Sequence, residues 1–404
     1  MSLREKIECE IREHGRMPFS RYMELCLYDP ELGYYSRNAE QFGKAGDFYT
    51  SSDVHAVFGR LLARQFEEMW RALDSPEQIE ILELGPGRGL FANDVLGWSK
   101  KKFPYFFHAL HYSLAERSPS LQVRLRHTLN GFLESEKSSV ICDRTPAIIR
   151  GRDQHGKGTA LAVPNNVALH RALAPEVPLI IFANEFFDAL PVEVLSSQGQ
   201  LHIEVHDGRL RETWYRPSPE ALELLDHYSV HPEPGERVEV ALISQDYMAK
   251  AAALMQRGFV IIIDYGYTRD EQLAGRHRGT LTAYRQHSVS ASPYEAPGEQ
   301  DITAHVNCTA LAAAGEQNGL RIQPLLTQSQ FLMGIGQQNQ FADAFEECRL
   351  PQERAKVALQ LKHLVTPAGM GESFHVLVAS KGVFPDRVCQ LTGMSFGKPS
   401  FAHN

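Results

Sequence analysis

A short apolar run that ends in three closely spaced glycines constrains the fold of this chain more than any other feature. Residues 79–84 read Ile-Glu-Ile-Leu-Glu-Leu, a length typical of a buried parallel strand. Glycines follow at positions 85, 87 and 89, and a helical pattern begins at Leu90. A strand that turns through glycines into a helix exposes backbone N–H groups and the positive end of a helix dipole. The pattern therefore predicts an α/β sheet with a ligand at this turn.

The spacing of the glycines separates two classes of cofactor. The dinucleotide fingerprint is G-x-G-x-x-G, whereas this chain reads G-x-G-x-G, with an acidic residue two positions before the first glycine. That is the pattern of S-adenosylmethionine (SAM) methyltransferases. The proline inside the turn also lacks the N–H that a pyrophosphate would require. We predict SAM as the cofactor, and a tight strand–helix turn without a ligand is the alternative for the motif alone. The predicted contacts are Glu83, Gly85, Pro86, Gly87 and Gly89.

Two further segments are predicted to complete the cofactor site. Residues 110–115 read as a second strand that ends at Glu116, whose carboxylate can accept hydrogen bonds from both ribose hydroxyls. The loop 43–52 is glycine-rich, aromatic and polar, and a loop of this composition can fold over the site as a lid; an ordinary exposed connection is the more common interpretation. The loop residues assigned to the cofactor are Gly46, Asp47 and Phe48.

A polar string follows the clearest later strand, residues 178–183. It contains Asn184, Glu185 and Asp188, and ligands of a doubly wound sheet bind beyond the carboxyl ends of its strands. Carboxylates here can hold a guanidinium through paired charge-assisted hydrogen bonds, or orient an amine and remove its proton. We therefore assign catalytic roles to these three residues. The alternative is that Asn184 caps a helix and the acids occupy its first turn, and both can hold at once.

Three later residues are predicted to contact the substrate. Asp264 and Tyr265 follow the buried run 259–263 on the same sheet edge, and His305 lies further along the chain. Helix capping is equally open for Asp264, and a core or loop histidine is the more common interpretation of His305. The six cysteines are scattered singly without a C-x-x-C pair, so the sequence predicts neither a metal site nor a disulfide framework.

Composition limits the remaining function classes. The net charge of −8 argues against a nucleic-acid substrate and is compatible with a basic peptide. No apolar run has the length of a membrane span, so no membrane insertion is expected. Residues 1–13 mix acidic and basic side chains, unlike a signal or transit peptide, which predicts a cytoplasmic location. The sequence leaves the oligomeric state open.

The pattern of predicted elements divides the chain into parts. Ser20 is placed to cap a helix over residues 22–28, and residues 239–257 read as a helix. The parts are an N-terminal helical extension with the lid-like loop over residues 1–75, a methyltransferase domain over 76–385 with an antiparallel insertion at about 192–240, and a loosely held tail over 386–404.

Taken in order, these strings resemble the family of SAM-dependent methyltransferase-like proteins that includes the mitochondrial complex I assembly factor and the bacterial and slime-mould homologues called MidA. The resemblance covers about residues 15–380. It departs at Asn307-Cys308, where relatives look like Asp-Phe. The strings that carry it are Tyr28-Asp29-Pro30 with Gly33-Tyr34-Tyr35, Gly46-Asp47-Phe48-Tyr49-Thr50, 83–89, 183–191, Asp264-Tyr265-Gly266, and Pro297-Gly298 with 301–306.

The resemblance implies a Rossmann-like, seven-stranded class I SAM-dependent methyltransferase sheet with inserted β/α elements. The mitochondrial member makes symmetric dimethylarginine on a complex I subunit, so the resemblance implies N-methylation of an arginine in a protein substrate. Asn184, Glu185 and Asp188 would then carry the acceptor chemistry. Two other classes stay open: a non-catalytic SAM-binding assembly factor or chaperone, and a nucleotide-binding oxidoreductase, against which the glycine spacing speaks.

Overall fold

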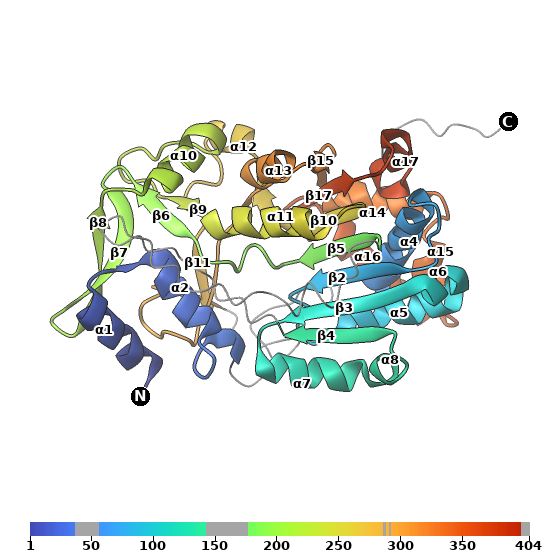
Figure 1. The fold of residues 1–404 in the computed structure, drawn as a ribbon, viewed down its shortest axis with the longest axis horizontal. Helices are drawn as coiled ribbons and strands as arrows, with labels where there is room; N and C mark the ends of the chain where they lie inside the picture. The colour runs from blue at the N-terminus through green and yellow to red at the C-terminus, as the bar shows by residue number, and fades with distance from the viewer. Residues whose placement is uncertain (37–55, 143–176, 286–287, 291, 397–404) are drawn as a thin grey trace.

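One large sheet and two smaller ones organise the part of the chain that the structure describes (Figure 1). The computed structural model describes residues 1–36, 56–142, 177–285, 288–290 and 292–396. Within this part of the chain, none of the helices combines the length and the apolar character needed to cross a membrane.

The large sheet follows a path of seven strands in the order β15, β17, β10, β5, β2, β3 and β4. The strands from β10 to β4 are parallel, and β17 is antiparallel to β10. This arrangement confirms the predicted Rossmann-like seven-stranded sheet. Two short strands, β14 and β16, pair with β10 and β17 off this path. The bounds are β2 Ile79–Leu84, β3 Leu110–Glu116, β4 Ser138–Cys142, β5 Leu179–Asn184, β10 Gly258–Tyr267, β14 Val306–Asn307, β15 Arg321–Ile322, β16 Leu326–Thr327 and β17 Phe374–Lys381.

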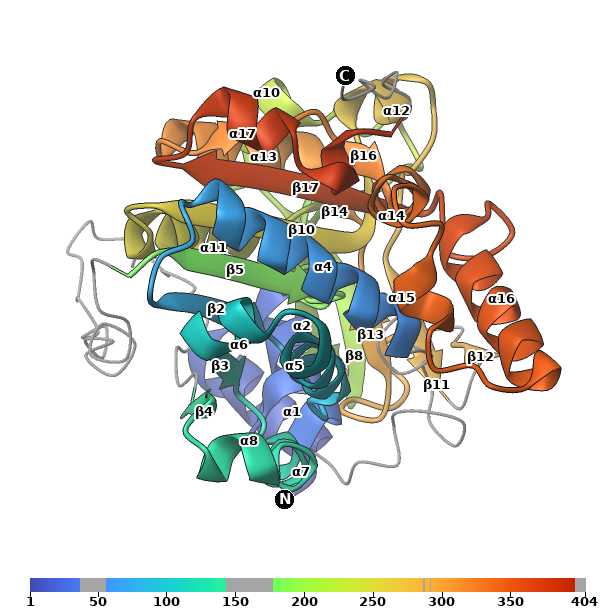
Figure 2. The same cartoon turned by 90° about the vertical axis from the view of Figure 1, so that its right-hand side faces the viewer.

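Helices cover both faces of the large sheet, which explains why its strands read as continuous apolar runs. In β5, Ile180 and Phe182 pack in one core with residues of α4 (Ala56–Ala72) and α5 (Leu90–Lys102). The alternate residue Ile181 packs in a second core with residues of α11 and α13. Figure 2 shows α4 crossing in front of strands stacked from β17 to β4. The other helices of this part are α6 Pro104–Ala109, α7 Pro119–Thr128, α8 Asn130–Glu134, α11 Leu242–Leu254, α12 Arg269–Leu273, α13 Cys308–Gln317, α14 Gln328–Gln337, α15 Ala342–Phe345 and α16 Pro351–Val365.

The first two helices pack against a second, five-stranded sheet. Strand β1 pairs with β7 in this sheet, so the N-terminal segment and the 192–240 region share one core. The domain boundaries at residues 75 and 385 remain a prediction. The elements are α1 Leu3–His14, β1 Met17–Pro18, α2 Phe19–Tyr28, β6 Glu193–Ser196, β7 Gly199–His206, β8 Arg209–Tyr215, α10 Pro219–Tyr228 and β9 Val238–Val240; a three-stranded sheet contains β11 Thr282–Arg285, β12 Ser288–Val289 and β13 Asp301–Thr303.

Two local predictions for this part are wrong. Ser20 does not cap α2, because the helix already begins at Phe19 and the Ser20 hydroxyl donates to the buried Glu193 carboxylate. The predicted helix over 239–257 begins only at Leu242, because Val238–Val240 pairs with β6 as a strand. In both cases a partner distant in sequence overrides the local signal.

The prediction of a loosely held C-terminal tail is also wrong as far as residue 396. Helix α17 (Pro385–Cys389) and the short 3₁₀ helix Thr392–Met394 bury Val388 and Leu391 in the core that contains α4. The carboxylate of Glu68 in α4 accepts hydrogen bonds from Thr392. Residues 397–404 lie outside the described part of the chain.

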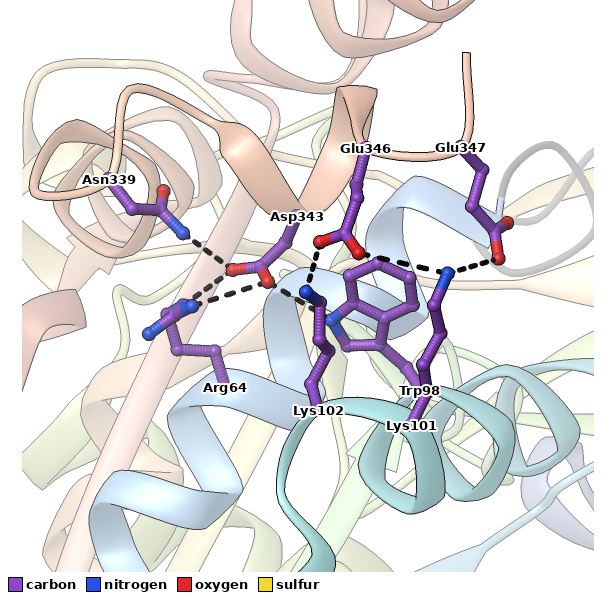
Figure 3. Close-up of polar contacts among 8 residues, drawn as sticks. All are labelled: Arg64, Trp98, Lys101, Lys102, Asn339, Asp343, Glu346 and Glu347. Atoms are coloured by element: carbon purple, nitrogen blue, oxygen red, sulfur yellow. Dashed lines mark hydrogen bonds and ion pairs between the residues drawn. The ribbon is translucent and has the colours of Figure 1, made fainter. Parts of the chain in front are cut away.

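A polar network ties α15 to α4 and α5, the helix that follows the glycine turn (Figure 3). The buried carboxylate of Asp343 accepts hydrogen bonds from Arg64 at 3.2 Å, from the Trp98 indole at 3.1 Å and from Asn339 at 2.7 Å. Lys101 and Lys102 form ion pairs with Glu346 and Glu347 nearer the surface. The network therefore holds α5 at its C-terminal end, whereas the glycine turn lies at its N-terminal end.

We predict that Asp343→Ala lowers the free energy of unfolding by about 2–3 kcal/mol, because three donors lose a shared buried acceptor. Glu347→Ala is the matched control, since its carboxylate is half-exposed and surface ion pairs contribute at most about 1 kcal/mol. Urea unfolding of both variants measures the difference. Equal losses in the two variants would contradict the role assigned to Asp343.

Candidate active site

The glycine turn after β2 uses conformations that other residues rarely adopt. The φ angles of Gly85, Gly87 and Gly89 are +65°, +55° and +74°. A Cβ atom built on Gly87 would meet no atom of the described residues within 4 Å, its two chain neighbours aside, so among these residues the space beside Gly87 is open to a ligand. A Cβ on Gly89 would lie 3.3 Å from Leu125 and Leu129. The turn therefore packs against other side chains at Gly89 and leaves space beside Gly87.

Gly85 brings the cofactor turn against the polar string after β5. A Cβ on Gly85 would lie 2.8 Å from the ring of Phe186. The neighbouring strands β2 and β5 place the two turns side by side, since Leu84 pairs with Ala183. The sequence did not indicate Phe186 as a contact of the glycine turn, because the contact depends on which strands are neighbours.

The two predicted acidic contacts of the cofactor occupy different environments. Glu83 is buried within β2, accepts a hydrogen bond from the Tyr112 hydroxyl at 2.9 Å, and burial raises the pKa of its carboxyl to about 8. Glu116 ends β3 at the ligand-binding edge of the sheet, and its carboxylate accepts a hydrogen bond from the backbone of Ser118 at 2.8 Å. Their direct contact with the cofactor stays a prediction. Gly46, Asp47 and Phe48 lie outside the described residues.

Asp264 organises the turn that follows β5. One oxygen of its carboxylate, Oδ2, accepts backbone hydrogen bonds from Phe186 at 3.1 Å, Phe187 at 2.8 Å and Asp188 at 3.4 Å. No helix follows β5, so the alternative in which Asn184 caps one is wrong. The N–H groups that such a cap would satisfy are instead satisfied from the adjacent strand β10. Asp264 is therefore a positioning residue for this turn.

Glu185 is held in a backbone conformation that is uncommon for its residue type. Its φ angle is +50°, in the left-handed region, where non-glycine residues are uncommon. The Glu185 N–H donates to the carbonyl of Ile263 at 3.0 Å, and the Asn184 side chain donates to Glu185 Oε1 at 3.1 Å. Strained residues of this kind cluster at functional sites, where the surrounding structure stabilises them. The predicted catalytic residues Asn184, Glu185 and Asp188 thus form one turn.

Six side chains form a cluster that we name the acceptor pocket after the role proposed for it below: the carboxylates of Glu185, Asp188, Asp264 and Asp301 together with Tyr28 and Tyr35. Burial raises the pKa of Asp188 well above its usual range, and the nearby charges of Asp264, Glu185 and Asp301 raise it further. Burial also raises the pKa of Asp264 to about 7, although its backbone hydrogen bonds favour the charged form. At neutral pH the carboxyls of Asp188 and Asp264 are therefore not both fully ionised.

The other two predicted substrate contacts lie beside this pocket, but in a different group. Tyr265 packs on Phe374 with ring centroids 3.9 Å apart, and the nearby Glu185 and Asp188 contribute to its raised pKa. The His305 ring stacks on Tyr265, and its Nδ1 lies 3.3 Å from that of His277. Burial lowers the pKa of His305 to about 4, so its ring is neutral at pH 7.

Three members of the pocket were not singled out from the sequence as site residues. They are Tyr28, Tyr35 and Asp301, and they come from α2, the 3₁₀ helix Tyr34–Ser36 and β13. All three lie in strings that carry the family resemblance. Their position in those strings could have indicated a functional role. Their proximity to Asp188 could be known only from the folded structure.

The sheet order and the open glycine turn define a class I SAM-dependent methyltransferase. The matching family model, described as "Putative S-adenosyl-L-methionine-dependent methyltransferase", covers residues 61–325, more than half of the chain. The protein belongs to this family.

Curated relatives match over most of their length. A Drosophila melanogaster protein named protein arginine methyltransferase NDUFAF7 homolog is 27% identical and covers 95% of this chain and 85% of its own. The Homo sapiens NDUFAF7 is 24% identical over 91% of this chain and 80% of its own. Both names include the word mitochondrial, so the expectation of a cytoplasmic location is contradicted.

Solved structures agree with the fold and the cofactor. A Burkholderia thailandensis protein with bound S-adenosyl-homocysteine aligns with a TM-score of 0.76 and 26% identity, covering 98% of this chain and 95% of its own. A second structure from the same organism aligns with a TM-score of 0.73 at 24% identity and supports the fold alone. SAM is the cofactor, and the open side of Gly87 fits a ligand that approaches the backbone closely.

We predict that Gly87→Val abolishes SAM binding while the protein still folds. The side chain would enter the space open to the ligand, at a backbone strain of about 1–2 kcal/mol. Gly208→Val is the matched control, because Gly208 has a φ of +67° and open space too, but lies in the turn between β7 and β8. Calorimetric titration with SAM and circular dichroism test both variants. Unchanged SAM affinity in a folded Gly87→Val protein would contradict the assignment.

We predict that two changes at Asp264 affect the stability of the fold to different extents. Asp264→Asn keeps an oxygen for the three N–H groups, whereas Asp264→Ala removes it and destabilises the fold by about 2–3 kcal/mol. The pKa of Asp264 is about 7 in the folded protein, above the value near 4 in the unfolded chain. The contribution of this group to the free energy of unfolding is therefore fully present below pH 4 and is lost as pH rises towards 7. The Asn variant should therefore lose less stability between pH 5 and pH 8. Thermal melts at both pH values measure this, and parallel pH profiles for wild type and Asn would exclude the effect.

Proposed function

We propose that this SAM-dependent methyltransferase transfers the methyl group to a guanidinium nitrogen of an arginine in a protein substrate. One observation carries the proposal: Asp188 and Asp264 are buried together, and no lysine or arginine among the described residues forms an ion pair with either. Buried carboxylates are normally paired, and an unpaired one is costly. A cation from the substrate would complete the pocket.

The chemistry of the turn after β5 supports a planar cation as the acceptor. A guanidinium presents five N–H donors in a fixed fork and pairs with carboxylates through two parallel hydrogen bonds. Glu185 and Asp188 belong to one tight turn, and Asn184 orients the Glu185 carboxylate. The curated relatives carry the name protein arginine methyltransferase, which supports the same acceptor.

Transfer requires alignment and a proton acceptor from the protein. SAM supplies a methyl group on a positively charged sulfur. Asp188 and Glu185 would hold the guanidinium with one nitrogen directed at the methyl carbon. Glu185 would then accept the proton that this nitrogen loses as its bond to the methyl carbon forms and the carbon–sulfur bond breaks, with the electron pair staying on sulfur. The contact between Phe186 and Gly85 holds the acceptor turn against the cofactor turn during this step.

Labelled-methyl transfer tests the function directly. The purified protein is incubated with methyl-labelled SAM and a lysate from a strain that lacks it, and the labelled band is hydrolysed and analysed for methylated amino acids. We expect label in methylarginine. Label in another amino acid would overturn the proposed acceptor, and SAM binding without any transfer would favour a non-catalytic assembly factor.

We predict that Glu185→Gln leaves SAM affinity nearly unchanged and lowers methyl transfer by a factor of about 10²–10⁴, the range for a positioned acid–base group. The amide keeps the shape of the side chain and an acceptor for Asn184, but loses the charge. Asp188→Asn should behave similarly if both acids grip one guanidinium. Turnover and SAM binding are measured for each variant.

Glu193→Gln provides the control for these variants, because Glu193 is a buried carboxylate in the second sheet, where it accepts a hydrogen bond from Ser20. Parallel loss of SAM binding and transfer in Glu185→Gln would assign Glu185 to the cofactor site. Loss of neither would mean that the string from Asn184 to Pro191 is structural.

A further inference from the structure

Three members of the acceptor pocket, Asp301, Tyr28 and Tyr35, come from segments that lie outside the turn after β5, and we call them the wall. Asp301 begins β13 and is 5% exposed, and its Oδ1 accepts a hydrogen bond from the Tyr35 hydroxyl at 2.9 Å. The carboxylate is close enough to Asp188 to raise the pKa of that residue. The charge on this wall therefore acts on the same space as the carboxylates of the turn.

Two tyrosines of the N-terminal segment, Tyr28 and Tyr35, are the other members of the wall. The Tyr28 hydroxyl donates to the carbonyl of Ala189 at 2.9 Å, directly after Asp188. The rings of Tyr28 and Tyr35 lie 5.5 Å apart with an interplanar angle of 31°. Aromatic faces attract a guanidinium, and their hydroxyls hold polar groups in place. The wall thus combines a carboxylate with aromatic rings, and the guanidinium of the protein's own Arg117 lies over the Tyr28 ring, 5.3 Å from its centroid.

A polar atom inside the pocket indicates that a donor is missing. Asp264 is 3% exposed, and while its Oδ2 accepts three backbone N–H groups, its Oδ1 has no hydrogen-bond partner among the described residues. A buried acceptor without a donor destabilises the fold, so such atoms call for an explanation. A substrate with several N–H groups would satisfy it.

The wall is also connected to the cofactor side. The Ser118 hydroxyl donates to the backbone carbonyl of Tyr35 at 2.6 Å, and the Ser118 N–H donates to Glu116, the predicted ribose contact. The short helix that carries Tyr35 is therefore bonded to the β3–α7 turn at one end and to Asp301 through its side chain. This bridge fixes the distance between the two sides of the site.

We infer that Asp301, positioned by Tyr35, is a further guanidinium-binding carboxylate that selects arginine over lysine in the acceptor pocket. The inference rests on the proposed function and deepens it. Carboxylates from two separate segments, the turn after β5 and β13, can engage N–H groups on two edges of a guanidinium. A lysine ammonium carries three donors at one point and can be held from the turn alone.

The test compares binding of two peptides, acetyl-Gly-Arg-Gly-amide and its lysine counterpart, to the full-length protein saturated with S-adenosyl-homocysteine. We expect the wild type to prefer the arginine peptide. Asp301→Asn should weaken arginine binding about tenfold and Tyr35→Phe about fivefold, the scale of one charged and one neutral hydrogen bond. Affinity for S-adenosyl-homocysteine and for the lysine peptide should change less than about twofold in each variant.

Tyr294→Phe is the matched control, because its hydroxyl donates to the Glu212 carboxylate at 2.9 Å outside the pocket. Circular dichroism checks folding, and Tyr35→Phe alone decides if Asp301→Asn fails to fold. A wild type that prefers the arginine peptide, with variants that retain this preference, would overturn the role of Asp301 and leave the proposed function standing. A wild type that binds neither peptide and makes no methylarginine in lysate would overturn both.

Discussion

The carboxylate of Asp264 is the interaction on which the rest of the site depends. It projects from β10 and accepts the N–H groups of three consecutive residues after β5. A strand that ends without a helix leaves backbone donors that must be satisfied, and a charged acceptor does this more strongly than a neutral one. With the turn anchored in this way, Glu185 can occupy a left-handed conformation and Asp188 can stay buried.

The hydrogen bonds of Asp264 also determine how the turn after β5 packs against the glycine turn of the cofactor site. Phe186 begins the anchored segment, and its ring occupies the space that a side chain at position 85 would take. Glycine at this position is therefore required both by its φ angle of +65° and by the ring. A displacement of the acceptor turn would move this ring against the cofactor turn. Alignment of donor and acceptor, which is the main task of a methyltransferase, thus depends on contacts between adjacent strands.

The parts of this structure that could be predicted from the sequence are those encoded by local patterns. The apolar run at 79–84 and the glycines after it predicted β2 and its turn, and the run at 178–183 predicted β5. Predictions failed where a distant partner decided the outcome. Ser20 bonds to Glu193, and the residues after Leu391 pack on α4. The acceptor pocket belongs to this second group, because its members come from α2, a 3₁₀ helix, β10, β13 and the turn after β5.

The distribution of charge in the pocket explains how a stable protein can carry it. Burial is the main cause of the raised pKa values of Asp188 and Asp264, and the charges of neighbouring carboxylates raise both values further. Protons therefore occupy part of the pocket when no cation is present. A bound guanidinium would favour the ionised forms of these carboxyls and release the bound protons. The positive charge of the acceptor would then take the place of the protons. A neutral acceptor would gain nothing from this exchange. Under the proposed function, the clustering of acids that costs the fold stability would be the property that favours a cation as the acceptor.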